Sequence, residues 1–157
     1  MGKIESKLEE LGLVLPEPLV LPSPNRTSGV IVGKMLYLSG HGAALLETDA
    51  VKKRGKVGLE VSEEEAYQTA RALALKMLAT VRHHLDDLDR VRRVVKILGM
   101  INAHPDFERH NVVLNGASDL FYEVFGPEIG CHGRSSVGVS GLVARQPVEI
   151  EGIFEIG

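Results

Sequence analysis

Two stretches decide the fold: GCHGRSSVGVS at residues 130–140 and VEIEGIFEI at residues 148–156. Apolar and polar residues alternate in both, which is the period of a β-strand, and a short Pro-containing link joins them. The pattern predicts an antiparallel hairpin of two strands. Its apolar face is expected to carry Val137, Val139, Val148, Ile150, Gly152, Phe154 and Ile156.

The other face of this predicted hairpin is polar. It is expected to carry Arg134, Ser136, Gly138, Ser140, Glu149, Glu151 and Glu155. A sheet face that combines one arginine with small residues and acids is poor core material. It is therefore either exposed to water or buried against something polar, and we expect function there.

Composition limits the class of protein. With 157 residues, 44% of them hydrophobic and 25% charged, the chain fits a single domain over residues 1–157, of which residues 1–22 form an N-terminal helix and an extended arm. A net charge of −3 and 4% aromatic residues predict no nucleic-acid partner. The single Cys131 fits a reducing compartment. Neither a membrane-spanning stretch nor a leader is recognised, so we expect a cytoplasmic location and no membrane partner.

Local patterns predict the remaining elements. A hairpin is expected over residues 30–38, an irregular loop over 41–59, a helix opening with a capping box at Ser62, a strand over 89–101 and a second helix over 106–125. The second helix is predicted to be irregular near Asn115-Gly116 and to stop at Gly126-Pro127. Two helices can cover only one face of a sheet. Because the strand at 89–101 is apolar on both faces, we expect another subunit to cover the second face.

Four short motifs in consistent order resemble one family. Ser39-Gly40, DDLDRV at residues 86–91, Arg134-Ser135 and VEIEGI at residues 148–153 resemble the Rid family of reactive intermediate deaminases, also called YjgF. The resemblance runs from about residue 23 to residue 156. It implies an α+β, chorismate-mutase-like two-layer fold, in which one mixed or antiparallel sheet is covered on one face by two helices. It also implies a barrel-cored homotrimer with sites in the clefts between subunits.

The resemblance implies cofactor-independent hydrolysis of small 2-imino or enamine carboxylates, of the 2-aminoacrylate type, to 2-oxo acids and ammonia, with no metal. Arg134 is expected to clamp the substrate carboxylate through two parallel hydrogen bonds. Glu149 is expected to orient the attacking water or move its proton, with Glu151 as the alternative acid. Ser39, Gly40 and Ser136 are expected to complete the pocket.

The sequence departs from the family pattern at three pocket positions. Ser136 stands where a Cys is usual, Arg26 where the arm carries a Tyr, and Asp119 where the helix carries an Asn. These departures, with the N-terminal helix and the longer loop, place the chain nearer a long-chain subgroup. Because of these departures, an alternative function remains: a non-catalytic trimer that binds or senses a carboxylate metabolite. A third reading, an endoribonuclease, is disfavoured by the acidic balance.

Two site residues also have structural interpretations. Arg134 could instead form a structural ion pair with Glu149 or Glu151. Ser136 is predicted to be a small pocket-lining residue, because the sequence shows no base and orienting group that would make it a nucleophile.

Overall fold

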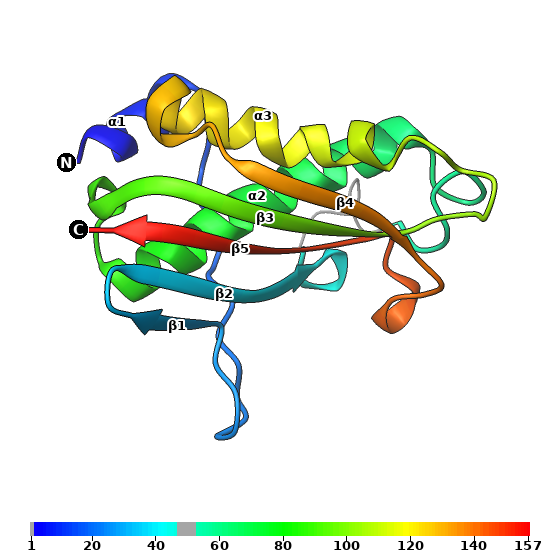
Figure 1. Ribbon diagram of the computed structural model, residues 1–157, viewed down its shortest axis with the longest axis horizontal. Coiled ribbons are helices and arrows are strands. Elements are labelled where there is room, and N and C mark those ends of the chain that lie inside the picture. Colours follow the sequence, from blue (N-terminus) through cyan, green and yellow to red (C-terminus); the bar gives the residue numbers. More distant parts are fainter. Residues whose placement is uncertain (1, 47–52) are drawn as a thin grey trace.

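The computed structural model describes residues 2–46 and 53–157; residues 47–52 of the expected loop lie outside the described residues. The main elements are α1 (Lys3–Glu10), β1 (Gly29–Val32), β2 (Met35–Gly42), α2 (Glu63–Leu85), β3 (Val91–Asn102), α3 (His110–Ile129), β4 (Gly133–Val139) and β5 (Val148–Ile156) (Figure 1). Within these residues, no helix has the length and apolar character needed to cross a membrane.

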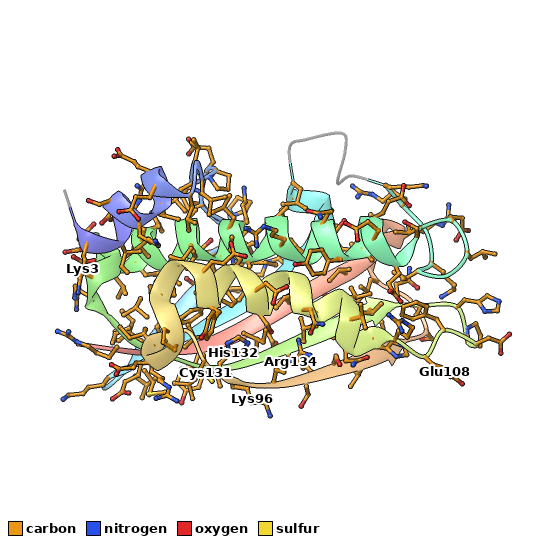
Figure 2. The ribbon with its side chains drawn as sticks, turned by 90° about the horizontal axis from the view of Figure 1, so that it is seen from above. Lys3, Lys96, Glu108, Cys131, His132 and Arg134 are labelled. Atoms are coloured by element: carbon orange, nitrogen blue, oxygen red, sulfur yellow. The ribbon has the colours of Figure 1, made fainter. Side chains whose placement is uncertain are left out.

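The strands of the described chain form one mixed sheet with the order β1-β2-β5-β3-β4. Only β3 and β4 are parallel, and the other neighbouring pairs are antiparallel. Helices α2 and α3 lie on one side of the sheet (Figures 1 and 2). The order of elements and the two-layer α+β arrangement predicted from the sequence are therefore confirmed.

The predicted hairpin of the last two strands is wrong, because β3 lies between β4 and β5. Strand β4 runs parallel to β3, with Arg134 opposite Ile97, whereas β5 runs antiparallel to β3, with Glu149 opposite Met100. Helix α3 is the crossover that returns the chain beside β3 in the same direction, as a β-α-β connection requires. Alternation in the sequence shows that a stretch has two faces, but it does not identify the neighbouring strand.

The core lies between the sheet and the two helices. The apolar face predicted for β5 is confirmed, since Val148, Ile150, Phe154 and Ile156 are buried. Phe154 meets Phe121 of α3 edge to face, with 5.9 Å between ring centroids. Strand β5 therefore binds the centre of the sheet to the helix layer.

The capping box predicted at Ser62 starts α2. The Ser62 hydroxyl accepts from the Glu65 N–H at 3.1 Å, and the Glu65 carboxylate accepts from the Ser62 N–H at 2.8 Å. Acidic residues fill the first turn, where they favour the positive end of the helix dipole. Because these start signals lie in consecutive residues, α2 could be predicted from the sequence alone.

Helix α3 differs from its prediction near Asn115-Gly116, where it shows no irregularity. The predicted stop at Gly126-Pro127 is confirmed as a break in the helix, because Gly126 has the non-helical angles φ 76° and ψ −179°, and a short further turn extends to Ile129. Gly116 is needed for a close approach of the helices, because a Cβ there would lie 2.1 Å from the backbone oxygen of Tyr67 in α2. The glycine that suggested a break is thus a packing residue.

We expect Gly116→Ala to lower the free energy of unfolding by about 2 to 3 kcal/mol, because the added methyl group must push α3 away from α2. That corresponds to a fall in Tm of roughly 4 to 12 °C, measurable by thermal unfolding. In an unobstructed helix the same change would stabilise the protein. The matched control is Gly141→Ala, where a Cβ would meet no atom within 4 Å. Equal Tm values for the two variants would contradict the packing role.

Candidate functional site

The structure separates the predicted site residues into two groups on opposite faces of the sheet. One group lies between β4 and α3, on the helix side: Arg134, Ser136 and Asp119. The other lies on β2 and β5 and on the loop before β1: Glu149, Ser39, Gly40 and Arg26.

The prediction that Arg134 and Ser136 share a face with Glu149 is wrong. Arg134 is opposite Ile97, which is buried under the helices, and Ser136 is opposite Gly99, where an added Cβ would meet Leu114 of α3. Both side chains therefore point toward the helix layer. The physical reason is that α3 turns polar side chains toward β4. The polar face of β4 can therefore lie on the helix side of the sheet, although that side is apolar in the other strands.

Three hydrogen bonds fix the Arg134 guanidinium against α3. Nη1 donates to Ser118 Oγ at 3.1 Å, and Nη2 donates to Asn115 Oδ1 at 2.8 Å and to the Asn111 carbonyl at 3.2 Å. The spacing of residues 111, 115 and 118 puts all three on one face of the helix. A guanidinium has five N–H donors, so two remain for a ligand.

Arg134 borders a small pocket of about 280 Å³. It is lined by Asn115, Ser118, Asp119, Tyr122, Gly130, Cys131, His132 and Arg134. Figure 2 labels three of these residues, Cys131, His132 and Arg134, where β4 runs beside α3. The size suits a small metabolite rather than a polymer.

Asp119 brings a negative charge to this pocket, and α2 holds it in place. Its Oδ2 accepts from the Tyr67 hydroxyl at 2.6 Å. This hydrogen bond, with burial, raises the pKa of Tyr67 to about 12. The Asp119 carboxylate is therefore already engaged by α2, and Arg134 is the residue with donors to spare.

His132 was not predicted as a site residue, yet it lies in the pocket and bonds Ser118. Its Nε2 is 3.0 Å from Ser118 Oγ, and its Nδ1 is 2.6 Å from the Gly130 carbonyl oxygen. Burial lowers the pKa of His132, the bond to Gly130 opposes this, and the charge of Arg134 lowers the pKa further. The available signal was its position two residues before Arg134, on the same side of an extended chain.

The second group surrounds Glu149 on the face without helices. A Cβ at Gly40 would lie 2.6 Å from Glu149 Oε1, so the glycine lets the carboxylate lie against β2. Burial, and then the nearby Glu151, raise the pKa of the Glu149 carboxyl. Such a shift favours proton exchange closer to neutral pH.

The arm before β1 reaches the same end of β2. The Ser39 hydroxyl donates to the Thr27 carbonyl at 2.6 Å, which places Arg26 one residue from this contact. Arg26 is exposed, and its side chain has no partner within residues 2–46 and 53–157. Arg26, Ser39, Gly40 and Glu149 thus form one neighbourhood, without Arg134.

The helix-free face around Glu149 is partly apolar. Tyr37, Val95 and Val137 are exposed on the sheet. A hollow of about 420 Å³ lies between strands there, with Lys96 and Glu151 among its lining residues. No described helix covers this face.

One group of possible metal ligands occurs in the described part of the chain: Glu5, Asp87 and Asp89, whose ligand atoms lie within 4.8 Å of one another. The Asp89 carboxylate accepts from the backbone N–H groups of Lys3 and Ile4, so it caps the start of α1. Capping of α1 therefore explains the position of Asp89 without a bound metal ion.

The fold, a mixed sheet with both main helices on one face and an arginine pocket at its edge, is of the chorismate-mutase-like class. The chain belongs to the YjgF (Rid) family, because the family described as "YjgF/chorismate_mutase-like, putative endoribonuclease" matches residues 5–143. The resemblance found in the sequence and the fold that it implied are therefore confirmed.

Similar proteins cover almost the whole chain. Protein TCP17 of Trypanosoma cruzi is 37% identical over 156 residues, which are 99% of this chain and 95% of that protein. The structure of Atu1372 from Agrobacterium tumefaciens, described as of unknown function, has 36% identity and a TM-score of 0.86, covering 98% of this chain and 94% of its own. A Shewanella oneidensis structure that carries the endoribonuclease label has 28% identity and a TM-score of 0.89, covering 99% and 100%.

Proposed function

We propose that this protein hydrolyses small imines or enamines that carry a carboxylate, giving 2-oxo acids and ammonia without a cofactor. Arg134 binds the carboxylate, and Glu149 orients the water or moves its proton. Ser136 and Asp119 line the Arg134 side of the site, and Ser39, Gly40 and Arg26 line the Glu149 side. Membership of the YjgF family supports this reading.

The observation that carries the proposal is the Arg134 guanidinium, which α3 holds in place with two donors unused. A guanidinium held in this way loses little rotational freedom when it binds a planar carboxylate. An iminium carbon is already electrophilic, so the protein has to supply orientation and modest acid–base help.

A complete site needs a second copy of the chain. Arg134 and Glu149 point to opposite faces of the sheet, so one chain does not bring them together. The partly apolar face around Glu149 fits the expected homotrimer, in which it would cover the β4 edge of a neighbour. We therefore place Arg134 of one subunit with Glu149 of another.

In the test, an amino-acid oxidase generates 2-iminopropanoate and 2-iminobutanoate in situ, and the disappearance of each imine is followed. We expect the protein to accelerate the loss in proportion to its concentration, and Arg145→Ala to behave like the wild type. Arg145 is an exposed arginine paired with Glu60. No acceleration, with the imine demonstrably formed, would contradict the catalytic reading.

The alternative is a non-catalytic trimer that binds a carboxylate metabolite. The three bonds already made by Arg134 are compatible with it, because a rigid arginine suits binding as well as turnover. In that case 2-oxobutanoate would raise the Tm of the protein while the imine assay stayed flat.

A further inference from the structure

A chain of hydrogen bonds in the Arg134 pocket extends beyond the contacts that the proposed imine chemistry uses. It runs from the Gly130 carbonyl to His132 at 2.6 Å, from His132 to Ser118 at 3.0 Å, and from Ser118 to Arg134 at 3.1 Å. All four residues line the same pocket of about 280 Å³. A serine, a histidine and a group that orients the histidine are the parts of a nucleophilic site.

The partners fix where the protons lie. A carbonyl oxygen can only accept, so His132 Nδ1 carries the proton and donates it to Gly130. In the neutral ring Nε2 is then an acceptor, and the Ser118 hydroxyl donates to it while accepting from Arg134. The imidazole is thus held in the tautomer that can remove the Ser118 proton.

Two features distinguish Ser118 from an ordinary helical serine. Serines inside helices commonly bond the carbonyl four residues earlier, whereas the bonds of the Ser118 side chain go to His132 and Arg134, outside the helix. In addition, the guanidinium beside the hydroxyl stabilises the negative charge that develops on Oγ when the proton leaves.

We propose that Ser118 is a nucleophile, activated by His132, which accepts acyl groups from small esters or thioesters that carry a carboxylate. The proposal goes beyond imine hydrolysis and does not depend on it. The two reactions would share Arg134 as the carboxylate-binding residue.

The reaction balances with the residues present. Ser118 Oγ attacks the acyl carbon as its proton passes to His132 Nε2, and a tetrahedral oxyanion forms. The bond to the leaving alkoxide or thiolate then breaks, and the leaving group takes the proton from His132. A water molecule, deprotonated by His132, then attacks the acyl carbon. The bond from that carbon to Ser118 Oγ breaks, Oγ takes the proton back from His132, and the carboxylic acid is released.

Asn115 can stabilise the oxyanion. Its Oδ1 accepts from Arg134, which turns its amide nitrogen away from the guanidinium, and Asn115 lies three residues before Ser118 on the same face of α3. The amide nitrogen has no partner among the residues that the structure describes. Side-chain amides serve in this way in other acyl-transfer sites.

The experiment treats the protein with diisopropyl fluorophosphate and follows labelling by intact mass and peptide mapping. This organophosphorus reagent reacts with activated serines. We expect one adduct, on Ser118, which is absent in Ser118→Ala and forms about 100-fold or more slowly in His132→Gln. Ser140→Ala, an exposed serine outside the pocket, should label like the wild type. Excess 2-oxobutanoate should slow labelling because its carboxylate occupies Arg134.

Circular dichroism checks that each variant is folded, and the wild type alone gives a second test. Its labelling rate should fall at acidic pH, as His132 becomes protonated. Absence of an adduct on Ser118, an unchanged rate in folded His132→Gln, or modification confined to the exposed Cys131 would overturn the proposal. Labelling requires no imine turnover, so the proposed deaminase activity and the serine nucleophile fail independently.

Discussion

Arg134→Ala is expected to lower kcat/KM for imine hydrolysis by about 30-fold to several-thousand-fold. A charged contact between a guanidinium and a desolvated carboxylate is worth about 2 to 5 kcal/mol when one partner is removed. In this pocket the loss is not replaced, because the other charged side chain at its edge, Asp119, is negative and bonded to Tyr67. The measurement is the rate of imine loss at several substrate concentrations.

Two further variants separate binding from folding. Arg134 joins β4 to α3 through three hydrogen bonds, so the alanine variant also loses stability and its fold must be checked by circular dichroism. Arg134→Lys keeps the charge but not the planar fork, and we expect it to lose most of the rate. A loss below about threefold in a folded alanine variant would make Arg134 a structural residue.

His41 is expected to make the protein acid-sensitive. The residue is fully buried, with Nδ1 2.7 Å from the Ser39 carbonyl and Nε2 2.8 Å from the Thr80 hydroxyl. The same hydroxyl accepts from the Leu19 N–H at 3.0 Å, which fastens the extended arm to α2. Burial lowers the pKa of His41 from 6.5 to about 4, the bond to Ser39 opposes this, and the charge of Lys76 lowers the pKa further.

The direction of the effect follows from proton binding. Below pH 6.5 the imidazole takes up a proton in the unfolded chain, whereas in the folded protein it stays neutral down to about pH 4. Stability is therefore unaffected by this group above pH 6.5, falls as the pH drops from 6.5 to about 4, and levels off below. A pKa difference of this size corresponds to about 3 kcal/mol.

Urea unfolding across this pH range measures the loss. We expect His41→Gln, which keeps hydrogen-bonding groups but does not titrate, to show a shallower decline than the wild type. His83→Gln is the matched control, since His83 is an exposed histidine of α2. Parallel pH curves for the wild type and His41→Gln would contradict this assignment.

The elements that the sequence predicted correctly are those encoded by neighbouring residues. The capping box at Ser62, the β1–β2 hairpin with Gly33 at its turn and the buried alternation of β5 each depend on a few consecutive residues. The pairing of β4 was wrong because it depends on α3, which carries the chain back beside β3. The reading of Gly116 as a break was wrong because its function is a contact with Tyr67, far away in the sequence.

The same difference applies to the candidate site. The motif residues Arg134 and Glu149 could be selected from the sequence, but their placement on opposite faces depends on strand partners that alternation does not reveal. The Ser118–His132 pair joins a helix to the segment before β4. Its sequence signal was the spacing of Asn111, Asn115 and Ser118, a polar stripe at helical period in a largely apolar helix, which predicts a polar partner without identifying it.

The position of β5 has a consequence for how the protein is made. Strand β5 follows the other strands in the sequence, yet it lies between β2 and β3 and pairs with both. While a ribosome is still adding residues before Val148, the two halves of the sheet have no central strand to join them, and the backbone N–H and C=O groups along the facing edges of β2 and β3 stay unpaired. Folding of the sheet therefore waits for synthesis of residues 148–156. Until then the unpaired strand edges are open to pairing with other chains, which is a route to aggregation.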